Sequence, residues 1–405
     1  MLDYLACCLE LLLIFIRKPE NQRWLFIASP VVLLVGFVMK SLLYFVFIQV
    51  FFLFILTYWR PAWIMDFSNW TNLRKNNFVV KYLQVGDFTF CYAERGKPSD
   101  SSSSILFLHG LSASKEMWFP MVTAIPSDRH VVLLDMPGHG KSTQKIDFSY
   151  SFMNQASRVA QFVIASGLGT KPFHLIGISM GGGVAIAYAA THPRDVSKLS
   201  LLCPAGCADW DKADYMQDVK KGLITTGAGM MPINFREQEK VFPYLFYMTG
   251  KKIPSLHGNE KSDYMKDIES GRIVTDSGKM PLNAEEQHKA FRYMFYMPKG
   301  FKLPRMYSWL AFEITKSKRP IHGKVSNDLE ADVNNKALHK YFPKITSPTL
   351  VLWGKHDRLV HPSGADVLKA ALPKCEVHML HKCGHTISYD RPFKALKLIL
   401  KFDES

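Results

Sequence analysis

The chain has 405 residues, 48% of them hydrophobic, and a formal net charge of +15. This length suits one large domain with insertions, or two domains. The positive charge occurs without a motif of interleaved basic and aromatic residues, so an anionic membrane surface is a better partner than nucleic acid. The seven cysteines lack metal-ligand spacing, which argues against a zinc site, and no other metal or cofactor is implied.

Residues 1–65 hold most of the long apolar runs and predict an N-terminal membrane anchor. The best span, Ser41 to Trp59, is 19 residues without a charge, which is long enough to cross a bilayer. The earlier runs, 4–16 and 24–39, are shorter, so we expect a single pass and leave open a hairpin or an interfacial first segment. Basic residues flank the span on both sides and do not fix its orientation.

Short apolar runs predict the strands of a sheet after the anchor. Alternating polarity from Phe78 to Tyr92 predicts two antiparallel strands. Buried strands are then predicted at 105–108, 131–134, 173–178, 199–203 and 349–353, and helices at 152–165 and 180–191. Strands that alternate with helices indicate an α/β fold, a mostly parallel sheet covered by helices. Ligands of such sheets bind at the carboxyl ends of the strands.

The stretch "FHLIGISMGGGVAIAYAATHP" places Ser179 between glycines, at the junction of a predicted strand and a predicted helix. A tight turn there could serve close packing alone. The strand, turn and helix are also the setting of a nucleophile elbow, which lifts a serine hydroxyl above the sheet edge. We interpret Ser179 as a nucleophile and the backbone N–H of Met180 as one donor to the reacting oxygen.

Two later strand ends carry the partners that a serine nucleophile needs. Asp357 follows one strand in "LVLWGKHDRLV", and His385 lies in a glycine-containing loop after the last strand. An imidazole must take the serine proton, and a carboxylate must hold that imidazole in the correct tautomer. The order Ser, Asp, His is that of an α/β-hydrolase triad. Leu111, after a His-Gly turn, is placed to supply the second oxyanion donor.

Each assignment has an alternative within the chain. His378 and His381 compete with His385, but they fall within the predicted strand and at its end. Asp366 competes with Asp357, but it falls on the following helix. His109 is a candidate substrate contact, although bracing of the oxyanion loop is the simpler interpretation.

These motifs together resemble a known family. The segments "ILFLHGLSASKEMW", "VVLLDMPGHG", "KPFHLIGISMGGGVAIAYAA" and "LVLWGKHDRLVHPSGAD" are similar to those of membrane-anchored monoacylglycerol lipases of the α/β-hydrolase-domain family. The resemblance covers roughly residues 60–210 and 345–403. It implies the triad of Ser179, Asp357 and His385, with Leu111 and Met180 at the oxyanion positions. It also implies a catalytic domain that faces the cytosol on endosomal, lysosomal or related internal membranes.

Residues 208–344 depart from the resemblance and contain an internal repeat. Residues 212–248 return as 261–297, with more than half of the aligned positions identical. Two copies are too few for a solenoid, so we predict a duplicated helical lid. The hydrolase core is then expected in two parts, 66–207 and 345–405. Phe246 and Phe295 belong to aromatic clusters at the ends of the repeats and are candidate substrate contacts.

The sequence therefore predicts a membrane-bound serine hydrolase that cleaves the ester bonds of monoacylglycerols through an acyl-enzyme. Lysophospholipids are the second substrate class. Two rivals remain open: an inactive, membrane-tethered lipid-binding protein of the same fold, and a hydrolase of soluble substrates, which would not need residues 41–59.

Overall fold

In the computed structural model the chain forms two units, Met1–Ile64 and Met65–Ser405. The predicted domain boundaries inside the second unit stay a prediction. The structure describes residues 37–51, 61–208, 212–223, 275–276, 280–281, 317–357 and 359–405.

An eight-stranded sheet forms the centre of the second unit, in the order β1-β2-β4-β3-β5-β6-β9-β10. The β1–β2 hairpin is antiparallel, as predicted, and β2 also pairs antiparallel with β4. The remaining pairs are parallel. The strands are β1 Val79–Val85, β2 Phe88–Arg95, β3 Ile105–Leu108, β4 Val131–Leu134, β5 Phe173–Ile178, β6 Val196–Leu202, β9 Thr349–Gly354 and β10 Cys375–Leu380.

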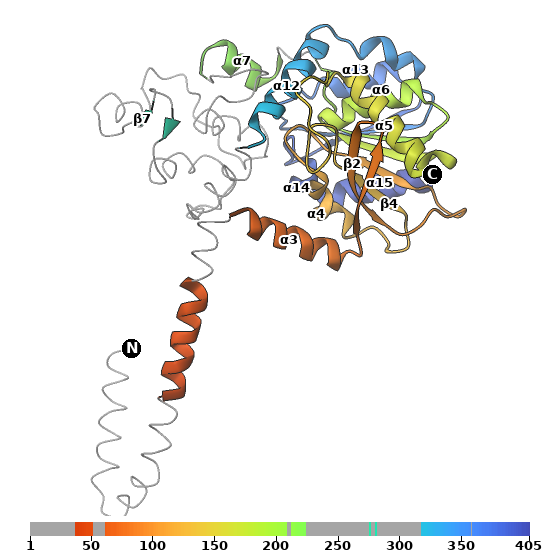
Figure 1. Cartoon of the computed structure of the whole chain (residues 1–405). Coiled ribbons are helices and arrows are strands. Elements are labelled where there is room, and N and C mark those ends of the chain that lie inside the picture. The colour runs from red at the N-terminus through yellow and green to blue at the C-terminus, as the bar shows by residue number, and fades with distance from the viewer. Residues whose placement is uncertain are drawn as a thin grey trace, which may run out of the picture. The chain divides into compact units, whose positions relative to one another are not determined.

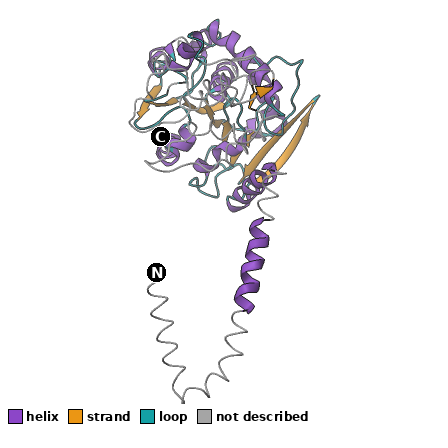
Figure 2. Ribbon diagram, turned by 90° about the vertical axis from the view of Figure 1, so that its left-hand side faces the viewer, coloured by secondary structure: helices purple, strands orange, loops and turns teal. Residues whose placement is uncertain are grey.

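Helices cover both faces of this sheet (Figure 1). On one face α5 packs on α6, and the 3-10 helix η7 lies against α6 and α13; on the other, α15 contacts α4 and β9. Figure 2 shows strands between the helices of this unit and long strands along its outer edge. The bounds are α4 Phe119–Val122, α5 Phe152–Ser166, α6 Met180–Thr191, α13 Gly364–Ala371, α14 Ile387–Asp390 and α15 Pro392–Glu404, with 3-10 helices η2 Lys115–Trp118, η3 Leu168–Thr170 and η7 His339–Lys344.

The central strands are apolar because both of their faces lie against helices. Every residue of β3, β4, β5 and β9 is buried, which is the pattern of a parallel sheet covered on two sides. Helix α6, rich in glycine and alanine, is buried from Met180 to Ala190. Its small side chains let it pack closely on the strands, so the turn that precedes it is held firmly.

The N-terminal region is described only in part. Residues 37–51 are helical and their side chains are exposed. Among the helices that the structure describes, none has both the length and the apolarity that a bilayer crossing requires. Residues 52–59 of the predicted span and the shorter runs before residue 37 lie outside the described residues. The helix α3, Pro61–Lys75, follows.

The predicted lid is also described in part. The described portions are α7 Asp214–Lys220, the short paired strands β7 Thr275–Asp276 and β8 Met280–Pro281, and α12 Arg319–Asn334. Most of both repeat copies, including Phe246 and Phe295, lies outside the described residues.

Candidate active site

Ser179 occupies the sharp turn between β5 and α6, with φ 53° and ψ −119°. A non-glycine residue with this φ is strained, and such strain is stored at functional sites. The turn is held from three sides, because the Ser179 N–H donates to Leu202 O at 2.9 Å and its carbonyl accepts from Gly183 N and Ala205 N. The structure therefore displays Ser179 at the carboxyl end of β5.

The glycines around Ser179 permit close backbone contacts. A β-carbon at Gly177 would collide with the carbonyl of Gly181, and one at Gly181 would collide with the carbonyl of Leu108. A β-carbon at Gly110 would lie 3.3 Å from the Cβ of Ser179, so the loop after β3 passes directly beside the elbow. The small residues of the motif thus explain the tight turn, and the tight turn exposes the serine.

His385 and Asp357 meet at the same edge of the sheet. The Nδ1–H of His385 donates to Asp357 Oδ2 at 2.8 Å, and both side chains are buried. The other carboxylate oxygen, Oδ1, accepts from the N–H groups of Leu359 and Val360 at 3.0 and 2.9 Å. These three bonds fix the carboxylate, which in turn fixes the tautomer and the plane of the imidazole.

The alternatives weighed from the sequence lie elsewhere. His378 is within β10 and pairs with Glu376 at 2.5 Å, and His381 is exposed just after the strand. Asp366 is exposed on α13. The geometry therefore favours His385 and Asp357 over these three residues.

Cys203 is a neighbour that the sequence argument did not assign. It follows β6, is fully buried and has a φ of 43°, and its ligating atom lies within 4.8 Å of those of Asp357 and His385. Burial, followed by the charge of Asp357, raises the pKa of this thiol well above its usual range. A protonated thiol, and an imidazole nitrogen already bonded to the carboxylate, suit acid–base chemistry better than a metal ion. In the sequence Cys203 is the last residue of a predicted strand, and this position at the carboxyl end was the signal available.

The candidate oxyanion residues flank the elbow. Met180 is the first residue of α6, where an N–H has no partner within the helix. Leu111 follows Gly110 in the loop beside Ser179 and packs partly buried against the core. This arrangement is compatible with two N–H donors near one reacting oxygen, and the role of both residues stays a prediction.

His109 makes hydrogen bonds that hold this loop in place. It is fully buried, its Nδ1–H donates to Gly110 O at 2.8 Å, and its Nε2 accepts from the N–H of Met136 at 2.9 Å. Both ring nitrogens are therefore occupied by the protein. The structure gives His109 a bracing role, while its predicted contact with substrate stays untested.

A second Ser–His–Asp arrangement lies inside the fold. His174 bonds Ser200 Oγ through Nε2 and Asp403 through Nδ1, each at 2.8 Å. Ser200 is fully buried within β6, where backbone N–H groups belong to the sheet ladder and are not available to an oxyanion. An ester has no approach to a buried hydroxyl within a strand. These three residues match a catalytic triad in type, but their burial and their hydrogen bonds indicate a structural role.

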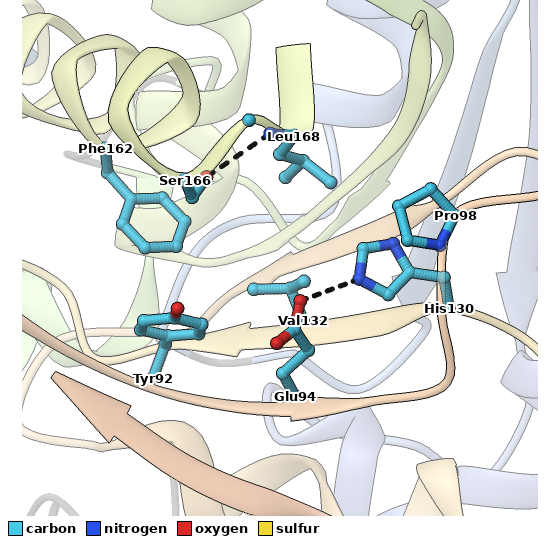
Figure 3. Close-up of a pocket in the computed structure, with 9 residues that line it drawn as sticks. Tyr92, Glu94, Pro98, His130, Val132, Phe162, Ser166 and Leu168 are labelled. Carbon is cyan, nitrogen blue, oxygen red and sulfur yellow. Dashed lines mark hydrogen bonds and ion pairs between the residues drawn. The ribbon is translucent and has the colours of Figure 1, made fainter. Parts of the chain in front are cut away.

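A small cavity also lies away from the elbow (Figure 3). Its volume is about 140 Å³, and it is lined by Tyr92, Phe162 and Leu168 together with a pair formed by His130 and Glu94. His130 Nε2 lies 2.9 Å from Glu94, which Lys81 also binds. These partners hold the pKa of Glu94 at about 2, with His130 the largest cause. The Glu94 carboxylate on the cavity wall is therefore already paired with side chains of the protein.

Comparison with known proteins identifies the family. The family model described as alpha/beta hydrolase fold matches residues 104–222 and 318–392. A monoacylglycerol lipase abhd6-B of Xenopus laevis is 33% identical over 346 residues, which cover 84% of this chain and 87% of that protein. The chain belongs to the ABHD6 family. The human monoacylglycerol lipase ABHD6 is 31% identical over 342 residues, with the same coverage. The chain is thus a serine hydrolase of the α/β-hydrolase fold with lipases among its ABHD6-family relatives.

Solved structures agree on the fold. A bacterial membrane phospholipase A aligns with a TM-score of 0.61 at 23% identity and covers 90% of this chain and 98% of its own. The carboxylesterase CesB of Bacillus subtilis aligns with a TM-score of 0.52 at 16% identity, covering 84% and 98%. At these identities the likeness concerns the fold alone.

Proposed function

We propose that the chain is a membrane-tethered esterase that cleaves monoacylglycerols to free fatty acid and glycerol through an acyl-enzyme on Ser179. The observation that carries this proposal is the Asp357–His385 pair at the sheet edge that also displays the strained Ser179 elbow. The names of the ABHD6-family relatives support the substrate class.

The reaction proceeds in two halves. Ser179 Oγ attacks the ester carbonyl while His385 Nε2 takes its proton, and Asp357 stabilises the resulting imidazolium through Nδ1–H. The N–H groups of Leu111 and Met180 receive the oxyanion. His385 then returns the proton to the glycerol oxygen as it leaves. A water molecule, activated by the same imidazole, releases the fatty acid and restores the serine.

The membrane tether is the second element of the proposal. The uncharged run from Ser41 to Trp59 spans the bilayer once, and the hydrolase faces the cytosol on endosomal or lysosomal membranes. Exposed apolar side chains along residues 37–51 support contact of this segment with lipid. Resistance of the full chain to alkaline carbonate extraction tests the tether, and release into the carbonate wash would overturn it.

A substrate panel tests the activity. The full-length protein in mixed micelles should hydrolyse a long-chain monoacylglycerol faster than the matching lysophospholipid, and the Ser179→Ala variant should be inactive on both. Faster turnover of the lysophospholipid would replace the proposed substrate class. A wild-type protein without turnover on any ester would instead support the rival of an inactive lipid-binding protein.

A further inference from the structure

Helix α3 carries a stripe of exposed aromatic side chains. Trp63, Phe67 and Trp70 are 58%, 66% and 51% exposed. Their spacing of four and three residues places them on one face of the helix, and Arg74 continues the same row. Large aromatic residues are costly to leave in water, and a row of them marks a binding surface. We call Trp63, Phe67, Trp70 and Arg74 the α3 stripe.

The α3 stripe is ordered by contacts among its own members. The rings of Phe67 and Trp70 stack with centroids 5.9 Å apart, and the guanidinium of Arg74 lies 5.7 Å from the centre of the Trp70 ring. Leu73, between them in sequence, is buried in the core of the hydrolase unit. Because Leu73 anchors a different side of the helix, rotation cannot bury the stripe without pulling Leu73 out of the core.

The composition of the stripe indicates its occupant. Tryptophan beside a guanidinium matches the headgroup layer of a bilayer, where its amphipathic ring sits and the cation meets phosphate. Phenylalanine is typical of the apolar face of an interfacial helix. Lys75 adds a second cation in the last turn of α3. The chain enters α3 directly after the uncharged run that ends at Trp59. The aromatic rings, the two cations and the adjacent uncharged run together favour a lipid surface as the occupant.

We infer that α3 lies in the plane of the membrane interface, with the α3 stripe inserted among phospholipid headgroups. This inference rests on the proposed tether and adds a fixed orientation to it. The tether alone would not fix the orientation of the hydrolase unit relative to the bilayer. A helix that is embedded on one side and joined to the core through Leu73 holds the hydrolase unit at one angle to the lipid surface that supplies its substrate.

Site-specific photocrosslinking in the full-length protein tests the placement. A p-benzoylphenylalanine replaces Phe67 or Trp70 in protein reconstituted into vesicles of phosphatidylcholine and phosphatidylserine that contain a radiolabelled phospholipid. Ile164, 76% exposed on α5, is the matched control. We expect lipid label at positions 67 and 70 several-fold above that at position 164. Equal labelling at the three positions, or crosslinks from 67 and 70 to protein, would overturn the inference.

Turnover gives a second, independent readout. The double variant Phe67→Ser, Trp70→Ser should lose activity several-fold on monoacylglycerol presented in vesicles, while hydrolysis of a water-soluble short-chain ester stays at the wild-type level. Ile164→Ser should change neither activity. An unchanged rate on vesicles would contradict the orienting role of α3. If the wild-type protein does not hydrolyse the soluble ester, the proposed function is wrong. If the full-length protein does not float with the vesicles, both the tether and the placement of α3 are wrong.

Discussion

At the scale of single residues, the most constrained group in the site is the Asp357 carboxylate. One oxygen accepts from His385 Nδ1–H and the other accepts from two backbone N–H groups, so neither is free to rotate. In the proposed mechanism the carboxylate sets the tautomer of His385: it keeps the hydrogen on Nδ1, so that the lone pair of Nε2 can accept the serine proton.

The variant Asp357→Asn should therefore keep the fold and lose the reaction. The amide oxygen would accept from the backbone N–H groups, and the NH₂ would face His385 Nδ1 and force the opposite tautomer. We expect a fall in kcat of about 10⁴-fold with little change in KM. Steady-state kinetics on a monoacylglycerol measure this change. Asp366→Asn on the exposed side of α13 is the control, and an equal loss there would point to a general effect of charge.

At the scale of elements, the C-terminal helix α15 is locked to the sheet by polar contacts. Asp403 accepts from Arg129 at 2.5 Å and bonds His174 of β5, while Lys198 of β6 donates to the carbonyl of Phe402. Asp403 is mostly buried, and its pKa is lowered by His174 and Arg129 against the opposing effect of burial. Removal of the carboxylate would leave a buried guanidinium and imidazole without their partner.

The Asp403→Ala variant should lose about 3 kcal/mol of stability, which is typical when one member of a buried charged pair is removed. Ser200→Ala, which deletes the far end of the same network, should cost about 1 kcal/mol. Both should keep fluorophosphonate reactivity at temperatures where they remain folded. Thermal unfolding in detergent gives the two shifts, and a Ser200→Ala protein that is stable but inactive would show that the buried group takes part in catalysis.

The elements around the active site could be predicted because each depends on local pattern. Helix α6 has the predicted bounds, Met180–Thr191, since a strand, glycines and an alanine-rich run mark both of its ends. Strand β6 spans Val196–Leu202 rather than the predicted 199–203. Its start was missed because Lys198 is polar for a reason that lies in the C-terminal helix, where it donates to the carbonyl of Phe402. The partners of His174 are 26 and 229 residues away. No periodicity in the sequence signals such contacts.

At the scale of the whole molecule, three buried histidines link the loop after β3 to helix α12. The ring of His139 lies 5.3 Å from that of His109 and 4.9 Å from that of His322 on α12, between ring centroids. The Nε2 atoms of His139 and His322 are buried without a hydrogen-bond partner. Burial lowers the pKa of His109 to about 4 and those of His139 and His322 to about 3, and the nearby charge of Lys318 adds to the effect on the latter two.

This histidine cluster should make the protein unstable in mild acid. The unfolded chain takes up a proton on each imidazole near pH 6.5, whereas the folded chain takes it up only near pH 3 to 4. The unfolded state binds more protons in that window, so stability falls as pH drops below about 6.5, by up to about 1.4 kcal/mol per pH unit for each histidine. Unfolding measured from pH 7 to pH 5 should show this slope, and His322→Phe should make it shallower. A slope unchanged in that variant would contradict the assignment to the cluster.

Covalent labelling decides whether Ser179 is the nucleophile of a lipid esterase. The membrane fraction containing the full-length protein is treated with a fluorophosphonate, and the modified peptide is located by mass spectrometry. We expect a single adduct on Ser179, which is lost in Ser179→Ala and retained in Ser200→Ala, and labelling should be blocked by excess monoacylglycerol. An adduct on Ser200, or labelling that persists in Ser179→Ala, would contradict it.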